Sequence, residues 1–372
     1  MKKKILFIVS EDWYFISHRL QLALSAKKKG YEVILLSKDT GKFNQINNLG
    51  IECYNISWNR KILSPISLFK NVAFIKNKVK QIKPDIIHFI SLLPILLGLL
   101  ATIFNKDSKI ILSITGLGTI FIKNNFQIII LRIFVKFFLM FSFRRKKLSV
   151  IVQNKDDLEY CKNKLICPDH KIYIIRGSGI DINFHSYQSE PNSDPIVLAF
   201  VGRFLEDKGV KVLIQAFEIS LKSNSNLRLI LAGDIDRYNP SSITENYLNK
   251  VLKNNKIIWL KNVKDIRKVW KKAHLAILPS RREGLPKSLL EAAANGRAMI
   301  STDVPGCREI AIHNENAILV PIDDVEKLSL AINFLSKNNK IRKKYGFKSR
   351  KIVESDMSEE NVISNTLSVY EK

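Results

Sequence analysis

Residues 279–296 read PSRREGLPKSLLEAAANG and follow directly on an apolar run, Leu275–Leu278. The run has the length of a buried strand, Pro286 suits the first position of a helix, and Gly296 suits the residue after its end. The pattern therefore predicts a strand, a glycine-containing turn and a helix of roughly ten residues. The free N–H groups and the positive dipole end of such a helix form a natural site for a diphosphate.

Two carboxylates belong to this segment. Glu283 lies in the turn and Glu291 in the second turn of the helix, so they do not share one helix stripe. A carboxylate can accept hydrogen bonds from two vicinal hydroxyls, as a ribose or a hexose presents them. Glu291 at a nucleotide ribose and Glu283 at a sugar would fit one activated sugar along the helix start. The alternative is a solvated Glu283 with Glu291 paired to Lys287.

A second motif, GRFLEDKG, begins at Gly202 and follows another apolar run, Ile196–Val201. A glycine lets the backbone approach a ligand closely, and two cations five residues apart can clamp a diphosphate. Arg203 and Lys208 are these cations. The motif opens the same half of the chain that contains the two carboxylates.

The alternation of strand-length and helix-length runs extends through the whole chain, which favours parallel sheets covered on both faces. A helix is predicted over Ser17–Lys29, and another over Glu359–Tyr370 with a capping box at its start. The predicted strands are Ile5–Val9, Glu32–Leu36, Ile86–Ile90, Ile110–Ile114, Val150–Gln153, Ile172–Ile175, Ile196–Val201, Leu227–Ala232, Ile257–Leu260, Leu275–Leu278, Met299–Ser301 and Ala317–Val320.

A polar stretch, 177–195, interrupts this alternation and is interpreted as an interdomain linker. The sequence thus predicts an α/β protein with two Rossmann-like parallel-sheet domains, 1–176 and 196–345. The segment 346–372 is expected to return to the first domain as a C-terminal helix. In such domains ligands bind at the carboxyl ends of the strands, hence in the cleft between the two domains.

The charge of the chain is concentrated in its first half. The 372 residues carry 60 Lys and Arg against 34 Asp and Glu, a net charge of +26. Residues 1–176 hold 30 basic and 11 acidic residues, net +19, and the remainder has net +7. Such an excess points to a polyanionic partner, either nucleic acid or anionic lipid.

Phe121–Phe143 contains seven of the twenty Phe residues, and the basic run Arg144–Lys147 follows it. Basic residues that bracket a Phe, Ile and Leu helix are typical of an element in a membrane interface. The alternative is a core helix with exposed ends. No nucleic-acid-binding motif accompanies the charge, so an anionic membrane surface is favoured over nucleic acid.

Two further features of the sequence could suggest a membrane span and a metal site, but neither is predicted. The uncharged run Ile86–Phe104 is long enough for a membrane span, but Ser91, Pro94 and Gly98 favour a buried strand followed by a buried helix. The four cysteines show no paired metal-ligand spacing, so no metal site is expected from them.

Together these motifs resemble the retaining glycosyltransferases of the GT-B fold, family 4 (group 1). The resemblance spans nearly the whole chain, and its specific part is the pair Glu283 and Glu291, separated by seven residues. The other matching segments are VGR with KG at Arg203 and Lys208, LAGD at Gly233, PSRREGLP at 279–286, and GSGID at 177–181, where Ser178 replaces the family's Asn.

The resemblance implies that a sugar leaves UDP with retained configuration, without a metal, a cofactor or a protein nucleophile. Arg203 and Lys208 would neutralise the departing diphosphate, and Glu283 would complete the catalytic group. The Asp234-Ile-Asp236 sequence mimics a metal-binding motif of another transferase fold, but its place in mid-domain does not favour a metal. The donor-binding residues that the resemblance implies are Gly202, Gly233, Gly284, Leu285, Pro286 and Glu291.

Two segments of the first domain, EDWYFISHRL at 11–20 and ITGLG at 114–118, narrow the resemblance. They look like the branch that acts on polyprenyl-diphosphate-linked sugars, which includes bacillosamine-linked N-acetylgalactosaminyltransferases and O-antigen transferases. The acceptor-binding residues implied are His18, Arg19, Thr115 and Gly116.

The chain departs from the family pattern at two of these positions. Trp13–Ser17 stands where many members have Gly-Gly, and is expected to shape an acceptor site. Thr115 stands where many members have a catalytic His. His18 and His88 stay candidates for that role, with a structural role as the alternative for His88.

The expected function is the transfer of a hexose or N-acetylhexosamine from a UDP-sugar to a polyprenyl-diphosphate-linked saccharide. It would serve bacterial surface polysaccharide or glycoprotein glycan assembly on the inner face of the cytoplasmic membrane. The alternatives are a UDP-sugar epimerase of the same fold and a basic nucleic-acid-binding protein.

Overall fold

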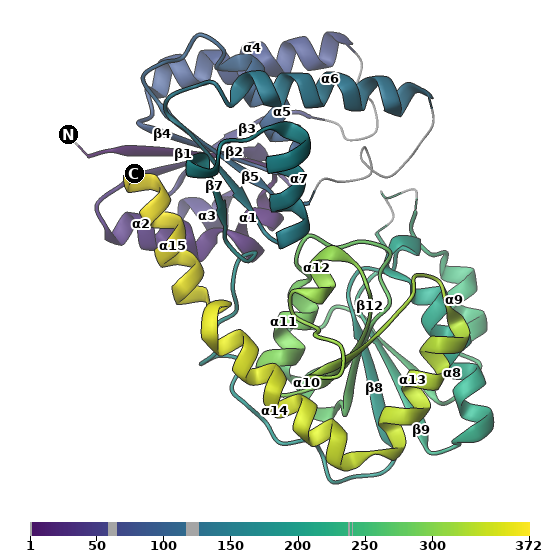
Figure 1. The fold of residues 1–372 in the computed structure, drawn as a ribbon. Coiled ribbons are helices and arrows are strands. Elements are labelled where there is room, and N and C mark those ends of the chain that lie inside the picture. Colours follow the sequence, from purple (N-terminus) through teal and green to yellow (C-terminus); the bar gives the residue numbers. More distant parts are fainter. Residues whose placement is uncertain (1, 59–64, 117–125, 237–238, 240) are drawn as a thin grey trace. The chain divides into compact units, whose positions relative to one another are not determined.

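A computed structural model describes residues 2–58, 65–116, 126–236, 239 and 241–372 (Figure 1). The chain divides into two compact units. Residues 1–178 and 362–372 form the first unit, and 179–361 form the second. Each unit is built around its own parallel sheet.

The first unit has a seven-stranded sheet in the order β3-β2-β1-β4-β5-β6-β7. Its central strands are runs of Ile, Leu, Val and Phe with both faces buried, which requires helices on both faces. The strands are β1 Lys4–Glu11, β2 Glu32–Lys38, β3 Glu52–Asn55, β4 Ile86–Ile90, β5 Lys109–Ile114, β6 Leu148–Val152 and β7 Ile172–Ile174.

Two groups of helices cover this sheet. The core of one face includes side chains of α4, α5, α6 and α7, and the core of the other includes side chains of α1, α2 and α15. The helices are α1 Asp12–His18, α2 Leu20–Lys28, α3 Phe43–Asn47, α4 Pro65–Ile82, α5 Leu92–Ala101, α6 Phe126–Ser142, α7 Lys155–Leu165 and α15 Glu359–Glu371, with the 3₁₀ turn η2 Asp169–Lys171.

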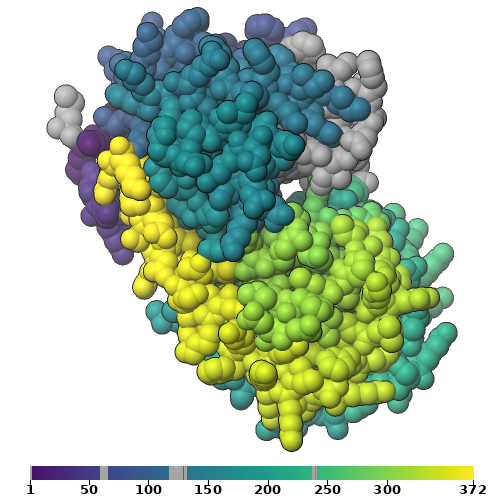
Figure 2. Space-filling view, in the orientation of Figure 1, coloured from purple at the N-terminus to yellow at the C-terminus, as the bar shows by residue number. Residues whose placement is uncertain are grey.

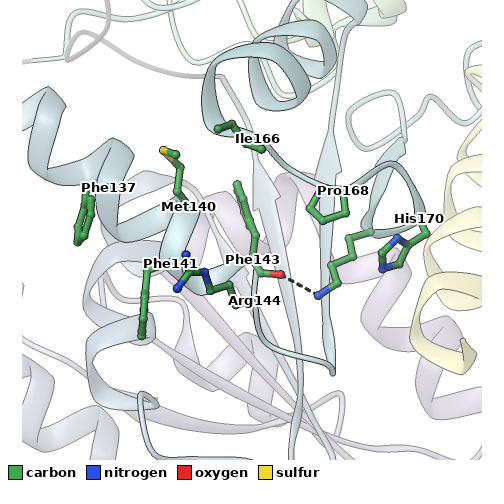
Figure 3. Close-up of a pocket in the computed structure, with 9 residues that line it drawn as sticks. Phe137, Met140, Phe141, Phe143, Arg144, Ile166, Pro168 and His170 are labelled. Atoms are coloured by element: carbon green, nitrogen blue, oxygen red, sulfur yellow. Dashed lines mark hydrogen bonds between the residues drawn. The ribbon is translucent and has the colours of Figure 1, made fainter.

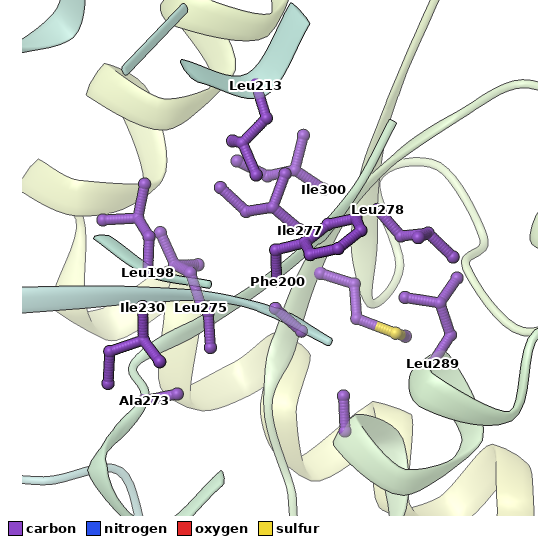
Figure 4. Packing of buried hydrophobic residues seen from close by; sticks show 14 of the residues in the cluster. Leu198, Phe200, Leu213, Ile230, Ala273, Leu275, Ile277, Leu278, Leu289 and Ile300 are labelled. Carbon is purple, nitrogen blue, oxygen red and sulfur yellow. The ribbon is translucent and has the colours of Figure 1, made fainter. Parts of the chain in front are cut away.

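The second unit has a six-stranded sheet in the order β10-β9-β8-β11-β12-β13. Figure 4 shows its core, where Leu198 and Phe200 from the central strand pack among the apolar side chains of neighbouring strands and helices. The strands are β8 Ile196–Val201, β9 Leu227–Ala232, β10 Ile257–Leu260, β11 Leu275–Leu278, β12 Ala298–Thr302 and β13 Ala317–Val320. The helices are α8 Val210–Ser223, α9 Glu245–Val251, α10 Arg267–Lys272, α11 Lys287–Ala294, α12 Pro305–Arg308, α13 Val325–Lys337 and α14 Asn339–Asp356, with the 3₁₀ turn η3 Glu206–Lys208.

The predicted α/β class with two Rossmann-like sheets is confirmed, with three local corrections. The edge strand β3, Glu52–Asn55, escaped prediction because its four residues carry polar and half-buried side chains. The helix predicted over 17–29 is broken at Arg19, whose backbone (φ −133°) separates α1 from α2. Pro286 has extended backbone (ψ 117°) and is the N-cap of α11, so the helix begins one residue later than predicted.

The stretch 177–195, predicted to be an interdomain linker, is mostly part of the second unit. From Gly179 onward this stretch belongs to the second unit. It is held there because the Glu190 carboxylate forms an ion pair with Arg342 at 2.6 Å, with both side chains buried, and because the Arg350 guanidinium donates to the His185 carbonyl at 2.6 Å. The stretch is therefore a packed part of a domain.

The C-terminal segment 346–372 is divided between the units. Helix α14 packs on α11 and β12 of the second unit, and only 362–372 belong to the first. In that unit the Tyr370 hydroxyl lies 2.6 Å from His88 Nδ1, and the buried side chains of Val362 and Leu367 join its core. Ser358 accepts a hydrogen bond from the Asn361 backbone N–H at 3.3 Å, as its predicted capping role requires.

The uncharged run Ile86–Phe104 forms strand β4 and helix α5 of the first unit, as the sequence predicts. Ser91 is the N-cap residue of α5, but its hydroxyl pairs with the Ser10 hydroxyl at 3.0 Å and does not cap the helix. Among the described helices, none combines the length and apolar composition that a bilayer span requires.

Candidate functional site

The sheet order of the second unit reverses between β8 and β11, its two central strands. At such a switch point the loops that follow the two strands leave in opposite directions and open a crevice at the carboxyl edge. The loop after β8 contains the predicted residues Gly202, Arg203 and Lys208. The loop after β11 contains Glu283, and it leads into α11.

The two loops are tied together by Asp207. Its backbone carbonyl accepts hydrogen bonds from the Ser280 hydroxyl at 2.9 Å and the Arg281 N–H at 2.8 Å. Its carboxylate forms an ion pair with Arg282 at 2.8 Å. Sequence reasoning missed this residue, although its place between the two predicted cations was a usable signal. These contacts fix the position of one motif against the other.

Lys208 and Glu283 meet across the loops. Lys208 Nζ lies 2.5 Å from Glu283 Oε1, and the Glu283 side chain is only 8% exposed. Two residues that are 75 positions apart in the sequence and were predicted separately are thus brought into contact. The site places a cation and a carboxylate side by side at the switch point.

Arg203 has a different partner, Asp236. Its Nη1 lies 2.8 Å from Asp236 Oδ2, and the guanidinium side chain is 46% exposed. Asp236, which lies in the loop after β9, therefore holds the Arg203 guanidinium. Asp234, in the same loop, accepts a hydrogen bond from the Asn262 N–H. Among the described residues no group of His, Cys, Asp and Glu side chains could hold a metal ion.

Two glycines allow close contact of backbones near these loops. A Cβ on Gly233 would lie 2.0 Å from the Gly202 carbonyl oxygen, and one on Gly209 would lie 2.0 Å from the Pro279 carbonyl oxygen. Both also have positive φ, +144° and +71°. Any larger residue would push the loops after β8, β9 and β11 apart.

Glu291 lies in the second turn of α11 and is buried. Burial raises the pKa of its carboxyl group from 4.5 to about 7, an effect that the Lys287 charge partly opposes. Gly284, Leu285 and Pro286 form the turn that leads into the first turn of this helix. The turn is packed against α12, because a Cβ on Gly306 would lie 2.4 Å from the Gly284 carbonyl oxygen.

The predicted acceptor residues lie in the first unit. His18 ends α1, its ring stacks on Tyr14 with centroids 4.3 Å apart, and its Nδ1 lies 2.5 Å from the Ser17 hydroxyl. Arg19 is buried and donates through Nη1 to the Gly177 carbonyl at 3.0 Å. Its Nε has no hydrogen-bond partner among the described residues.

Thr115 and Gly116 follow β5 and are half-buried. Residues 117–118 of the predicted ITGLG motif, and 121–125 of the Phe-rich stretch, lie outside the described residues. His18 and Thr115 thus follow strands β1 and β5, which both pair with β4 in the same parallel sheet.

His88 lies in the middle of β4 and is completely buried. Its two ring nitrogens lie 2.6 Å from the Tyr370 and Ser113 hydroxyls. Burial lowers the pKa of this imidazole well below its usual range, so the ring is neutral. His88 is a core residue, which corrects its candidacy as a catalytic histidine.

The switch point of the first unit lies between β1 and β4. The Ser10 and Ser91 hydroxyls pair across it, and Trp58 Nε1 donates to the Ser10 carbonyl at 2.6 Å. Asp12, in the predicted acceptor motif, is buried and accepts from the Thr40 and Lys42 N–H groups at 2.8 and 3.0 Å, and from the Thr40 hydroxyl. Asp12 therefore holds the loop after β2.

Comparison with known proteins identifies both halves of the chain. Residues 181–352 match the family described as glycosyl transferases group 1, and 4–154 match the family described as glycosyl transferase 4-like. Together these models reach from the first strand to helix α14.

Two curated relatives align over most of their length. The N,N'-diacetylbacillosaminyl-diphospho-undecaprenol alpha-1,3-N-acetylgalactosaminyltransferase of Campylobacter jejuni is 25% identical over 88% of this chain and 90% of its own. The capsular polysaccharide biosynthesis glycosyltransferase CapM of Staphylococcus aureus is 24% identical over 92% of this chain and 90% of its own.

Among solved structures, Anabaena HepE in complex with UDP and glucose superimposes with a TM-score of 0.75 at 15% identity. The match covers 98% of this chain and 99% of that one. It confirms the GT-B fold, with its two Rossmann-like domains.

Proposed function

The chain belongs to the group 1 glycosyltransferases, and we propose that it moves a hexose or N-acetylhexosamine from a UDP-sugar to a polyprenyl-diphosphate-linked saccharide. The product would be an intermediate of bacterial surface polysaccharide or glycoprotein glycan assembly. Transfer would retain the anomeric configuration and need no metal.

The observation that carries the donor half of the proposal is the contact of Lys208 with Glu283 at the switch point, beside the start of α11. When a UDP-sugar binds, its diphosphate meets Arg203, Lys208 and the N-terminal end of α11, where the helix dipole favours an anion. Positive charge held at the leaving group stabilises the transition state as charge develops there. The two cations do the electrostatic work that a metal ion does elsewhere.

The carboxylates bind the hydroxyl-rich ends of the donor. Once Lys208 turns toward the diphosphate, Glu283 is released to accept hydrogen bonds from the transferred sugar. Glu291 is buried one turn into the helix, where a ribose would donate two hydroxyls to it. Those donors favour its charged form and offset the burial that raises its pKa to about 7.

The acceptor half of the proposal assigns His18, Arg19, Thr115 and Gly116 to the saccharide diphosphate. Arg19 supports this role because its buried Nε has no hydrogen-bond partner among the described residues. Thr115 and Gly116 support it because they lie at the carboxyl edge of the sheet, where α/β proteins bind ligands.

The proposed site of action is the inner face of the cytoplasmic membrane. Helix α6 exposes a row of large apolar side chains, and Figure 2 shows the side chains of α6 and α7 on the surface of the first unit. Basic residues at the end of that row would meet anionic headgroups. The exposed row is Ile129, Ile133, Phe134, Phe137 and Phe141.

The test is a screen of UDP- and GDP-sugars against polyprenyl-diphosphate-linked saccharides, followed by mass spectrometry of the lipid product. We expect one UDP-sugar to add a single residue, with undiminished rate in a metal chelator and with the donor's anomeric configuration retained by NMR. Turnover of a UDP-sugar without acceptor would contradict the proposal and favour an epimerase. Transfer that requires a divalent metal would overturn the metal-free mechanism.

A further inference from the structure

A pocket of about 460 Å³ opens at the C-terminal end of α6 in the first unit. This volume falls within the range of roughly 300–1,000 Å³ typical of small-molecule sites. Figure 3 shows the side chains that line it, from α6 on one side and from the segment after α7 on the other. The lining residues are Phe137, Met140, Phe141, Phe143, Arg144, Ile166, Pro168, His170 and Lys171.

On one wall of the pocket, the ammonium group of Lys171 already has hydrogen-bond partners. Lys171 Nζ donates to the Phe143 carbonyl at 2.7 Å (Figure 3) and also to the Arg145 carbonyl at 2.6 Å. These bonds close the C-terminal end of α6 against η2. Lys171 is therefore a structural cation, and its ammonium group is not the part of the pocket that would meet a ligand.

Ile166, on the opposite wall, has an unfavourable backbone conformation and an exposed apolar side chain. It caps α7 with left-handed backbone (φ +54°, ψ +43°), a conformation that suits Gly or Asn and disfavours a β-branched residue. Its apolar side chain is also 67% exposed. Backbone strain and exposed apolar surface both cost free energy, and an apolar ligand on this wall would offset the second cost.

The mouth of the pocket is positively charged. Its lining contains no carboxylate, and it lies inside the acid-free stretch 108–155 on its α6 side. On the facing segment, the Asp169 carboxylate is neutralised by an ion pair with Lys162 at 2.9 Å. Arg144 is exposed, with its guanidinium carbon 6.0 Å from the centre of the Phe141 ring, and His170 lies on the facing segment. The pocket thus combines apolar walls with a cationic rim, which matches a hydrocarbon chain that carries an anionic head.

We propose that this pocket takes one hydrocarbon chain of an anionic bilayer phospholipid, with the lipid phosphate at Arg144. The inference rests on the membrane location in the proposed function and makes it specific. The pocket lies at the amino-terminal edge of the sheet, because α6 runs back from the carboxyl edge, where Thr115 lies, to the start of β6. With 17 residues α6 is about 25 Å long, so the lipid pocket is separate from the acceptor loop.

Calorimetry with dodecyl phosphate below its critical micelle concentration tests the proposal. We expect one molecule to bind per chain, while inorganic phosphate does not bind and dodecyltrimethylammonium binds at least about tenfold more weakly. Ile166→Asn should weaken dodecyl phosphate binding about tenfold without lowering the melting temperature, because Asn suits the left-handed cap. Arg144→Gln should remove most of the preference for the phosphate head.

The matched control is Ile66→Asn, which changes an equally exposed isoleucine on α4 and should bind dodecyl phosphate like the unmodified protein. Unchanged affinity in Ile166→Asn would overturn the proposal, as would binding of inorganic phosphate at the same site. If Ile166→Asn instead raises KM only for long-chain polyprenyl acceptors, the occupant is the acceptor chain and the assignment to a bilayer lipid is wrong. A failure of sugar transfer by the unmodified protein would contradict the proposed function and leave the calorimetric result standing.

Discussion

The two units share a strand order but hold their switch-point loops in opposite ways. The order β3-β2-β1-β4-β5-β6 in the first unit has the same pattern as β10-β9-β8-β11-β12-β13 in the second. In the second unit, ion pairs such as Lys208–Glu283 join the loops. In the first, the paired hydroxyls of Ser10 and Ser91 do so, and the buried Asp12 fixes the segment after β1 to the loop after β2. The cation of an ion pair can exchange its carboxylate partner for an anionic ligand. A buried carboxylate whose oxygens all accept hydrogen bonds within the protein cannot make such an exchange.

The largest effect should follow from removing Arg203 or Glu291, because the proposed function assigns both to the donor. Arg203→Ala and Glu291→Ala should each abolish transfer, measured as lipid product by mass spectrometry. Circular dichroism and the melting temperature should show folded protein in both variants. Near-normal turnover in either folded variant would mean that the ionic loops are not the donor site.

Lys208→Ala tests the contact that distinguishes the second switch point. Loss of one group that stabilises developing charge should lower kcat by about 10²–10³-fold. Arg281→Ala is the matched control, since Arg281 lies in the same loop but pairs with Asp323 on the exposed surface. We expect the control to keep most of its kcat, and equal losses in the two variants would contradict the special role of Lys208.

Asp12→Asn tests the opposite prediction, that the first switch point is structural. An amide has one acceptor oxygen, whereas Asp12 accepts with both: Oδ2 from the Thr40 and Lys42 N–H groups, and Oδ1 from the Thr40 hydroxyl and the Trp13 N–H. The free energy of unfolding should therefore fall by about 1–3 kcal/mol. Asp39→Asn, at an exposed carboxylate of the same loop, is the control. An Asp12→Asn protein of unchanged stability would remove the contrast between the two units.

The loss of stability in Asp12→Asn should depend on pH. Burial alone would raise the pKa of Asp12, but the hydrogen bonds from Thr40, Lys42 and Trp13 hold it below its usual value. Because the folded pKa is lowered, the stabilisation is present above the unfolded pKa of about 3.9 and is lost as pH falls through the folded pKa. The stability gap between the unmodified protein and Asp12→Asn should therefore narrow below about pH 4 in denaturant titrations.

The smallest effect should come from Asp236, which in the proposed site would compete with the donor for Arg203. Asp236→Asn should free the guanidinium and lower the Kd for UDP, by no more than about fivefold because exposed ion pairs contribute little. Calorimetric titration with UDP would measure it. Asp323→Asn is the control at another exposed pair, and a weaker affinity in Asp236→Asn would show that Asp236 assists the donor.

The sequence was sufficient to predict those strands and helix ends that local patterns determine. Runs such as Leu227–Ala232 and the punctuation of α11 by Gly296 identify strands and helix ends without reference to the rest of the chain. The family motifs correctly indicated a glycosyltransferase. The roles of the individual site residues remain predictions that the variants above test.

Contacts between distant residues were beyond such patterns. The polar stretch 177–195 looks like a linker because nothing in it shows that Glu190 has a buried partner 152 residues away. Asp236 was weighed only as a metal ligand, because its pairing with Arg203 depends on two loops that the sheet brings together. His88 was kept as a candidate because its burial is set by Tyr370 at the other end of the chain.

The assignment of 362–372 to the first unit gives the chain a defined order of maturation during synthesis. The second unit is continuous, so it can complete its fold as soon as residue 361 has left the ribosome. The first unit begins earlier in the sequence, but the segment that carries Tyr370 onto His88 is translated after the whole of the second unit. We therefore expect the second unit to complete its core before the first during synthesis, in reverse of their order in the sequence.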